Sequence, residues 1–172
     1  MITFKTATID HASSLVELVN SAYRGNQSKL GWTTEAELLD GQRTDSTSLT
    51  EIIQQPFNQI EMAFEADRLI GCVHIKIQDS ETLYFGMLTV SPALQARGLG
   101  KEIIKHVEKI AREHNLKKIK ITVIQHRHEL ISFYERRGFH PTGRYEEFPS
   151  HDPRFGLPKV PDLKLLEYEK NL

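Results

Sequence analysis

The residues best suited to chemistry in this chain lie in a glycine-rich stretch between Leu88 and Arg112. An apolar run, Leu88–Val90, is followed by a proline and then by the sequence Gln95-Ala96-Arg97-Gly98-Leu99-Gly100, after which an amphipathic helix is expected. Main-chain N–H groups at a helix N-terminus are free to bind an anion, and the helix dipole adds a partial positive charge there. Glycines also let the backbone approach a ligand closely. This stretch is therefore predicted to bind a phosphate group.

Two familiar phosphate-binding motifs do not fit this stretch. A P-loop requires G-x-x-x-x-G-K-S/T, but Gln95 takes the place of the first glycine and Glu102 that of the serine or threonine. A dinucleotide fingerprint requires G-x-G-x-x-G, and Ile103 stands where the third glycine belongs. The pattern that remains is Q-x-x-G-x-G. It indicates either a phosphate loop of another class or an ordinary strand-to-helix turn whose glycines serve packing.

This remaining pattern resembles the pyrophosphate-binding motif of the GNAT superfamily, the acyl-CoA-dependent N-acetyltransferases. A second stretch, ELISFYERRGF from Glu129 to Phe139, resembles another signature of that family, a short helix carrying a tyrosine followed by a glycine and an aromatic residue. The resemblance covers nearly the whole chain and is strongest from Phe85 to Thr142. It implies an enzyme that transfers an acetyl group from acetyl-CoA, its co-substrate, to a primary amine by direct attack in a ternary complex.

The resemblance also implies roles for individual residues. Main-chain N–H groups of the loop would hold the pyrophosphate, and those of the preceding strand would stabilise an oxyanion at a splay or bulge. The residues concerned are Gln95, Ala96, Arg97, Gly98, Leu99, Gly100 and Lys101 in the loop, and Leu88, Thr89 and Val90 in the strand. The side chains of Arg97 and Lys101 either add positive charge to this site or face solvent.

Tyr134 matches the family tyrosine that protonates the departing CoA sulfur. A phenol, with a pKa of about 10, stays protonated at neutral pH, whereas the thiolate that it meets belongs to a thiol of pKa near 8.5 by analogy with cysteine. A purely structural aromatic is the alternative interpretation. Arg127 is a departure, because the family often has an asparagine at this position that contacts the CoA arm. Either Arg127 contacts a CoA phosphate or an anionic substrate, or the contact is made otherwise.

The sequence identifies neither the general base nor the acceptor. The strand expected from 82 to 90 has no carboxylate within it, and the candidates that remain open are Glu35, Glu37, Asp40, His74 and His126. The region from 24 to 43, which carries Trp32, Glu35 and Arg43, either lines an acceptor pocket or packs as an ordinary loop. The acceptor is expected to be a small-molecule or peptide amine. The competing hypotheses are a non-catalytic acyl-CoA-binding sensor or assembly module, and a protein-lysine or N-terminal acetyltransferase with an open groove.

Composition and charge limit the classes of protein to which this chain could belong. A chain of 172 residues suits one domain, here 1–172, and its 26% of charged residues is ordinary for a soluble protein. No apolar run is long enough to span a membrane, and the first residues do not read as a signal peptide. The net charge of −1 argues against general nucleic-acid binding. Cys72 has no partner for an internal disulfide, which fits a reducing compartment, so we expect a cytoplasmic protein.

Three further expectations concern metals, Cys72 and assembly. His126 and His128 have no third ligand cluster nearby in the sequence, so no metal site is predicted. Cys72 shares a strand face with His74, yet a buried structural cysteine is the favoured interpretation. A homodimer is possible, because dimers are common in the family.

The elements that must position these residues follow from periodicity and turn signals. We expect an α/β (α+β) layout, a mixed sheet of about six or seven strands flanked by helices. This order of elements resembles the GNAT acyl-CoA N-acyltransferase fold. Strands are predicted at 2–8, 59–66, 69–78, 82–90, 118–124, 139–146 and 164–170. The first helix is predicted to begin after an N-cap at Asp10, and the next two to span 34–40 and the segment from Ser48 to before Pro56. The last two helices are predicted at 99–112 and 129–137. The strand at 118–124 should run parallel to that at 82–90. The segment 148–161 is predicted to be a long, functional loop.

Overall fold

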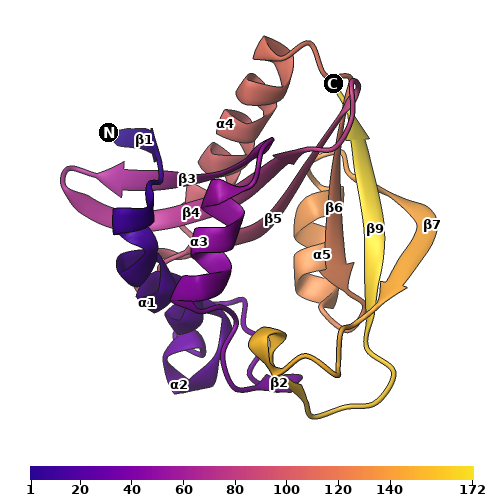
Figure 1. Ribbon diagram of the computed structural model, residues 1–172. Coiled ribbons are helices and arrows are strands. Elements are labelled where there is room, and N and C mark those ends of the chain that lie inside the picture. The colour runs from indigo at the N-terminus through magenta and orange to yellow at the C-terminus, as the bar shows by residue number, and fades with distance from the viewer.

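The computed structural model describes all residues from 1 to 172, and its centre is a seven-stranded mixed sheet (Figure 1). The strand order is β1-β3-β4-β5-β6-β9-β7. The strands span Ile2–Thr6 (β1), Asn58–Glu65 (β3), Arg68–Ile77 (β4), Thr82–Val90 (β5), Lys118–Ile124 (β6), His140–Glu147 (β7) and Lys164–Asn171 (β9). Only β5 and β6 are parallel, and every other neighbouring pair is antiparallel. The predicted mixed α/β layout, including the parallel pair, is confirmed.

Helices cover both faces of this sheet. The helices α1 (Ala12–Tyr23) and α3 (Ser46–Gln54) pack on one face, and α4 (Leu99–Glu113) and α5 (His128–Glu135) pack on the other (Figure 1). Strand β4 serves both layers, because the side chain of Cys72 joins the α1 side and that of Val73 joins the α4 side. No helix in the structure is both long enough and apolar enough to cross a membrane.

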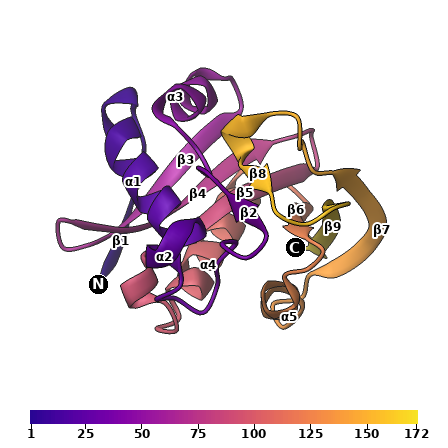
Figure 2. The ribbon, with the colours of Figure 1, turned by 90° about the horizontal axis from the view of Figure 1, so that it is seen from below.

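Short elements close one end of the molecule. They are α2 (Gly25–Ser28), β2 (Leu39–Asp40), β8 (Leu157–Pro158) and the single-turn 3-10 helices η2 (Pro92–Leu94) and η3 (Pro153–Phe155). A further single-turn 3-10 helix, η1 (Ile9–His11), directly precedes α1. The predicted long loop at 148–161 contains η3 and β8, and β8 pairs with β2 in antiparallel register. Figure 2 looks onto this end and shows β2 and β8 between α2 and β7.

The N-terminal half contains the predictions that were wrong. The segment 34–40, expected to be a helix, forms a turn and then β2, because Leu39 is buried and its strand pairs with β8. Long-range contacts here override a local capping signal. Asp10 is not the N-cap of α1, which begins at Ala12 after η1.

Helix α3 was predicted, with its end before Pro56, but its cap was misplaced. It begins at Ser46, and the carboxylate of Asp45 accepts a hydrogen bond of 2.7 Å from the N–H of Ser48. Asp45 is therefore the N-cap, and Ser48 lies inside the first turn.

The parallel pair separates soon after it forms. Strands β5 and β6 pair only from Thr82 to Tyr84 and from Lys118 to Lys120, although both continue for several residues. Beyond this point β5 carries an irregularity, with Met87 at a positive φ of 52° and a register shift against β4. Helix α4 follows β5 and α5 follows β6 at this same end. The separation therefore leaves an opening at the carboxyl ends of two parallel strands, where ligands of α/β proteins commonly bind.

Candidate active site

The loop before α4 presents a row of free main-chain donors. No protein atom accepts a hydrogen bond from the N–H groups of Ala96 through Lys101. Positive φ angles of 64° at Ala96 and 80° at Gly98 give the loop its shape, and Gly98 is the N-cap of α4. Left-handed residues alternating with ordinary ones turn successive N–H groups toward one side, which makes a concave anion site at the positive end of the helix dipole.

All of these donor residues except Arg97 line a cleft of about 380 Å³, which we call the loop cleft. It brings together most of the residues that the sequence singled out: Leu88, Thr89, Val90, Gln95, Ala96, Gly98, Leu99, Gly100, Lys101, Arg127 and Tyr134. Arg97 is the one predicted binding residue that does not line it. The lining residues that sequence reasoning missed are Ala22, Tyr23, Thr33, Leu130, Phe133, Arg136 and Arg137. Several of these residues lie beside Tyr134 in the ELISFYERRGF stretch, so this motif could have identified them.

The Gln95 side chain has a different place from the one that the pattern suggested. Its Oε1 accepts from the N–H of Thr33 at 3.3 Å, and its Nε2 donates to the carbonyl of Val90 at 3.2 Å. A Cβ at Gly31 would lie only 2.2 Å from this side chain, so the glycine there gives Gln95 its room. The Gln95 N–H is itself bonded to the carbonyl of Pro92, so the free donors begin one residue later than predicted. Gln95 fastens the loop at 31–33 to the end of β5.

Tyr134 lies where α5 faces the opening between β5 and β6. Its ring is only 5% exposed and packs against Phe85, Phe133 and Phe139, with ring centroids 5.3 to 6.0 Å apart. No protein group forms a hydrogen bond with its hydroxyl, which leaves that group available to a ligand. Burial raises the pKa of Tyr134 well above its ordinary value, so the phenol keeps its proton throughout the physiological range. The structure therefore makes Tyr134 both a core aromatic and a wall of the cleft.

A second cleft, of about 220 Å³, adjoins the first, and we call it the inner cleft. The two share Tyr23, Leu88, Arg127, Leu130 and Tyr134. The inner cleft runs between β5 and β6 and is lined by Phe148, Pro149 and Phe155 of the long loop, and by Arg24, Glu35 and Arg43. Glu35 and Arg43 thus line a pocket, as one of the two sequence interpretations had it. Trp32 instead lines the loop cleft, with its ring 5.5 Å from that of Phe133.

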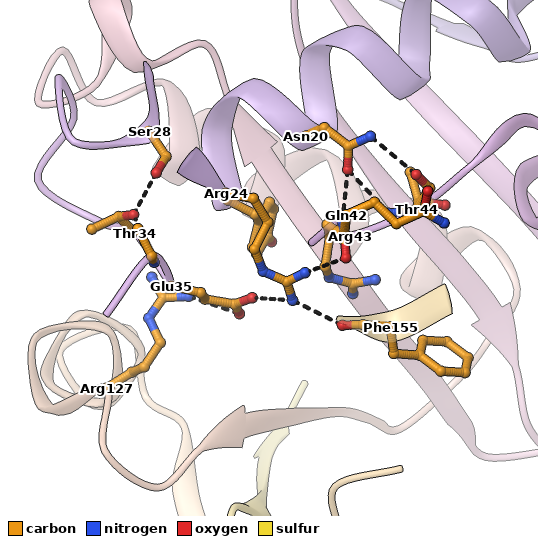
Figure 3. Close-up of polar contacts among 12 residues, drawn as sticks. Asn20, Arg24, Ser28, Thr34, Glu35, Gln42, Arg43, Thr44, Arg127 and Phe155 are labelled. Carbon is orange, nitrogen blue, oxygen red and sulfur yellow. Dashed lines mark hydrogen bonds and ion pairs between the residues drawn. The ribbon is translucent and has the colours of Figure 1, made fainter. Parts of the chain in front are cut away.

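A buried ion network supports the wall of the inner cleft (Figure 3). The carboxylate of Glu35 lies between two guanidinium groups, 2.8 Å from Arg24 Nη2 and 3.1 Å from Arg127 Nη1. Arg24 also donates to the carbonyls of Gln42 and Phe155. The network therefore joins the end of α1, the loop at 35 and the segment that covers the cleft.

Arg127 belongs to this network. Besides Glu35, its Nη2 bonds to the hydroxyl of Thr33 and its Nε lies 3.5 Å from the carboxylate of Glu129. Every nitrogen of its guanidinium thus has a protein partner, and the residue is only 3% exposed. The geometry places Arg127 in the framework that holds both clefts. A contact with the CoA arm or an anionic substrate stays a prediction.

None of the candidates for the general base lies unpaired in either cleft. Glu35 is the one carboxylate that lines them, and two arginines hold it. Glu37 pairs with Lys29 at the surface, and His126 is exposed. His74 lines neither cleft; it bonds to Asn58 at 2.8 Å, and burial lowers its pKa to about 4.

Cys72 is buried, and burial raises the pKa of its thiol to about 12. It lines neither cleft, and its side chain packs in the core beneath α1. A thiol with so high a pKa is a poor nucleophile, so the interpretation as a structural cysteine is the one that the structure supports.

The acyl-CoA-dependent acetyltransferase resemblance implied a splay or bulge in the strand before a loop of main-chain donors, and β5 has such an irregularity before a loop of free N–H groups. Comparison with known proteins agrees. The sequence profile of the acetyltransferase (GNAT) family matches residues 17–139, which is more than half of the chain. The chain belongs to the GNAT acetyltransferase family. No curated protein matches the chain significantly.

Solved structures share the fold over essentially the full chain. An acetyltransferase from Bacillus cereus described as an IAA acetyltransferase superposes with a TM-score of 0.70 at 12% identity, covering 100% of both chains. A GNAT family acetyltransferase from Elizabethkingia anophelis with acetyl-CoA bound gives 0.70 at 16% identity, covering 99% of this chain and 98% of that one. The PaiA N-acetyltransferase from Thermoplasma acidophilum in complex with coenzyme A gives 0.69 at 17%, with 100% and 99% covered. At such identities the likeness establishes the fold alone.

The ion network makes a prediction about stability. Replacing Glu35→Gln removes the shared partner of two buried guanidinium groups, which should lower the free energy of unfolding by about 3–5 kcal/mol. Urea-induced unfolding followed by circular dichroism measures this difference. The matched control is Glu37→Gln, whose partner Lys29 is at the surface, and its unfolding midpoint should equal that of the wild type. A Glu35→Gln midpoint indistinguishable from that of the control would mean that the network does not hold the fold.

Proposed function

We propose that the protein is an N-acetyltransferase that moves the acetyl group of acetyl-CoA onto the primary amine of a small acceptor, with both substrates bound at once. The observation that carries this proposal is that two clefts meet at Tyr134, and that one of them contains the loop of free main-chain donors. The relatives from Elizabethkingia anophelis and Thermoplasma acidophilum, which hold acetyl-CoA and coenzyme A, support assigning the loop cleft to the donor substrate.

The loop cleft fits coenzyme A in its charge and its shape. The free N–H groups from Ala96 to Lys101 suit the pyrophosphate, and Lys101 adds a positive charge at the cleft wall. Apolar groups of Leu88, Leu130 and Phe133 continue the cleft toward the opening and suit the pantetheine arm. Bound acetyl-CoA would supply the thioester carbonyl that the acceptor attacks.

The edge of β5 beside the opening would bind the developing oxyanion. After Tyr84, β6 no longer pairs with β5, so the main-chain groups on that edge are not used in a ladder. The hydroxyl of Tyr23 donates to the carbonyl of Leu88 at 2.7 Å and fixes the strand there. We assign the oxyanion donors to the N–H groups of Leu88 to Val90, which is a preorganised arrangement of the kind that stabilises such charge.

Proton balance assigns the role of Tyr134. The acceptor nitrogen forms a bond to the acetyl carbon, the bond from that carbon to sulfur breaks, and the Tyr134 hydroxyl gives its proton to the departing thiolate. Because neither cleft holds an unpaired carboxylate, we assign the proton lost by the acceptor amine to water. Tyr134 regains its proton from solvent before the next turnover.

The shape of the inner cleft favours a small acceptor over a protein chain. Phe148, Pro149 and Phe155 line it from the long loop, whereas a protein-lysine or N-terminal acetyltransferase would need an open groove. One observation favours a second candidate, a non-catalytic acyl-CoA-binding module: no unpaired carboxylate serves as a base. We place the protein in the cytoplasm, because its single buried cysteine is compatible with a reducing compartment.

Replacement of Tyr134 tests the enzyme against the binding module. Tyr134→Phe keeps the ring but removes the acid, so kcat should fall by about 10²- to 10⁴-fold, whereas the Kd for acetyl-CoA stays unchanged. Release of free thiol from acetyl-CoA across a panel of amines measures kcat, and calorimetry measures Kd. Tyr145→Phe, on the exposed strand β7, is the control and should retain full activity. If the wild type binds acetyl-CoA but acetylates no amine, the binding module is the better description.

The raised pKa of Tyr134 predicts the pH profile. The protonated form of Tyr134 is the active form, and a raised pKa keeps the phenol protonated at higher pH. We therefore expect kcat not to fall on the alkaline side up to a pH of about 9.5, where an ordinary phenol begins to ionise. A profile of kcat from pH 6 to 9.5, corrected for spontaneous thioester hydrolysis, checks this. A decline in kcat with a midpoint below a pH of about 9 would show that the acid is a group of lower pKa than Tyr134.

A further inference from the structure

One charged side chain in the inner cleft is unexplained by the acetyl-transfer chemistry. Arg43 follows β2, and its main chain is fixed to α1 through Asn20. The side-chain Oδ1 of Asn20 accepts from the N–H groups of Arg43 and Thr44, at 2.8 and 3.1 Å, and its Nδ2 donates to the carbonyl of Thr44 (Figure 3). The origin of the Arg43 side chain is therefore held rigidly at the wall of the cleft.

The guanidinium group of Arg43 has no anionic partner in the protein. It lies over the ring of Tyr23, 5.3 Å from the ring centre, and no protein oxygen accepts a hydrogen bond from it. Figure 3 shows it beside the guanidinium of Arg24, which is itself bonded to Glu35. Arg24 and Arg127 share the one carboxylate of this wall, so Arg43 is the arginine that remains for a ligand.

The charge of the inner cleft favours an anion. Three guanidinium groups line it, those of Arg24, Arg43 and Arg127, against the single carboxylate of Glu35, which leaves two positive charges in excess. Burial also keeps the phenols of Tyr23 and Tyr134 neutral by raising the pKa of each. A half-buried cation that lacks a counter-charge is unfavourable, and a ligand carboxylate would pair with the guanidinium in two parallel hydrogen bonds.

The size of the inner cleft limits the ligand. Its volume of about 220 Å³ is below the range of roughly 300–1,000 Å³ typical of pockets for drug-sized molecules. The ligand must also bring its amine to the opening that Leu88 and Tyr134 border. A molecule that carries both an amine and a carboxylate within this space is an amino acid or a close analogue.

We propose that the acceptor is a small amino carboxylic acid whose carboxylate binds Arg43 while its amine faces the opening between β5 and β6. This proposal rests on the acetyltransferase function proposed above and names the substrate class for it. Arg43 is then the specificity-determining residue, and the Arg24–Glu35–Arg127 network is the framework that keeps the other two guanidinium groups from taking its place.

The test compares matched acceptors and matched variants. Free amino acids, their carboxamides, the corresponding amines without a carboxylate, and a lysine peptide with blocked ends are assayed for thiol release with wild type, Arg43→Gln and Arg43→Lys. The wild type should use amino acids with a kcat/KM at least tenfold above that of their carboxamides. Arg43→Gln should abolish this preference by raising the KM for amino acids at least tenfold, with the KM for acetyl-CoA unchanged. Arg43→Lys should restore part of it, because the charge returns without the planar fork.

Two further measurements keep the outcomes apart. Arg68→Gln, at the exposed start of β4, is the control and should match the wild type. Calorimetric titration of amino acids and carboxamides into the CoA-bound protein reports the carboxylate site without turnover. If carboxamides or the blocked peptide serve as well as amino acids, or if Arg43→Gln keeps the preference, this proposal fails while the acetyltransferase function stands. If no amine is acetylated but amino acids bind through Arg43, the acetyltransferase function fails and the carboxylate site stands.

Discussion

The separation of β5 from β6 is the constraint on which the rest of this structure depends. The two strands pair only as far as Tyr84, and the hydroxyl of that residue then lies 3.1 Å from that of Thr122 across the widening gap. Interrupting a parallel ladder leaves main-chain groups of β5 without strand partners, which is costly unless other groups or a ligand take them up. One is taken by Tyr23, whose hydroxyl bonds to the carbonyl of Leu88. Both clefts border this gap, and Tyr134 lines both of them.

The buried network of Arg24, Glu35 and Arg127 lines the inner cleft beside this separation. It joins segments from the end of α1, the loop at 33–35, the start of α5 and the covering loop at 155. Such a network is a weak source of stability compared with apolar packing, but removing one member leaves buried charge uncompensated. Here the network fixes the position of the wall of the inner cleft, and it pairs two of the three arginines there with Glu35. The third, Arg43, has no anionic partner in the protein, and we propose that it binds the acceptor.

The sequence predicted those parts whose signals are local. Alternation and β-branched runs located all seven strands of the main sheet, and the glycine pattern located the loop of free donors together with α4. Local signals failed where distant segments decide the outcome. The capping pattern at Thr34 predicted a helix, but Glu35 has partners 11 and 92 residues away, and Leu39 pairs with β8. The inner cleft was only partly predicted for the same reason, because its lining comes from many separate stretches of chain that no periodicity connects.

The proposed function depends most directly on the loop of free N–H groups as the binding site of acetyl-CoA. Calorimetric titration of acetyl-CoA into Gly98→Val tests it most directly, because a β-branched residue at a φ of 80° must change the backbone and so redirect the donors. Gly143→Val is the matched control, since Gly143 has a φ of 83° and, like Gly98, open space where a Cβ would stand. The account predicts one site in the wild type, at least tenfold weaker binding to Gly98→Val, and wild-type binding to Gly143→Val. Equal affinity in all three proteins would contradict it.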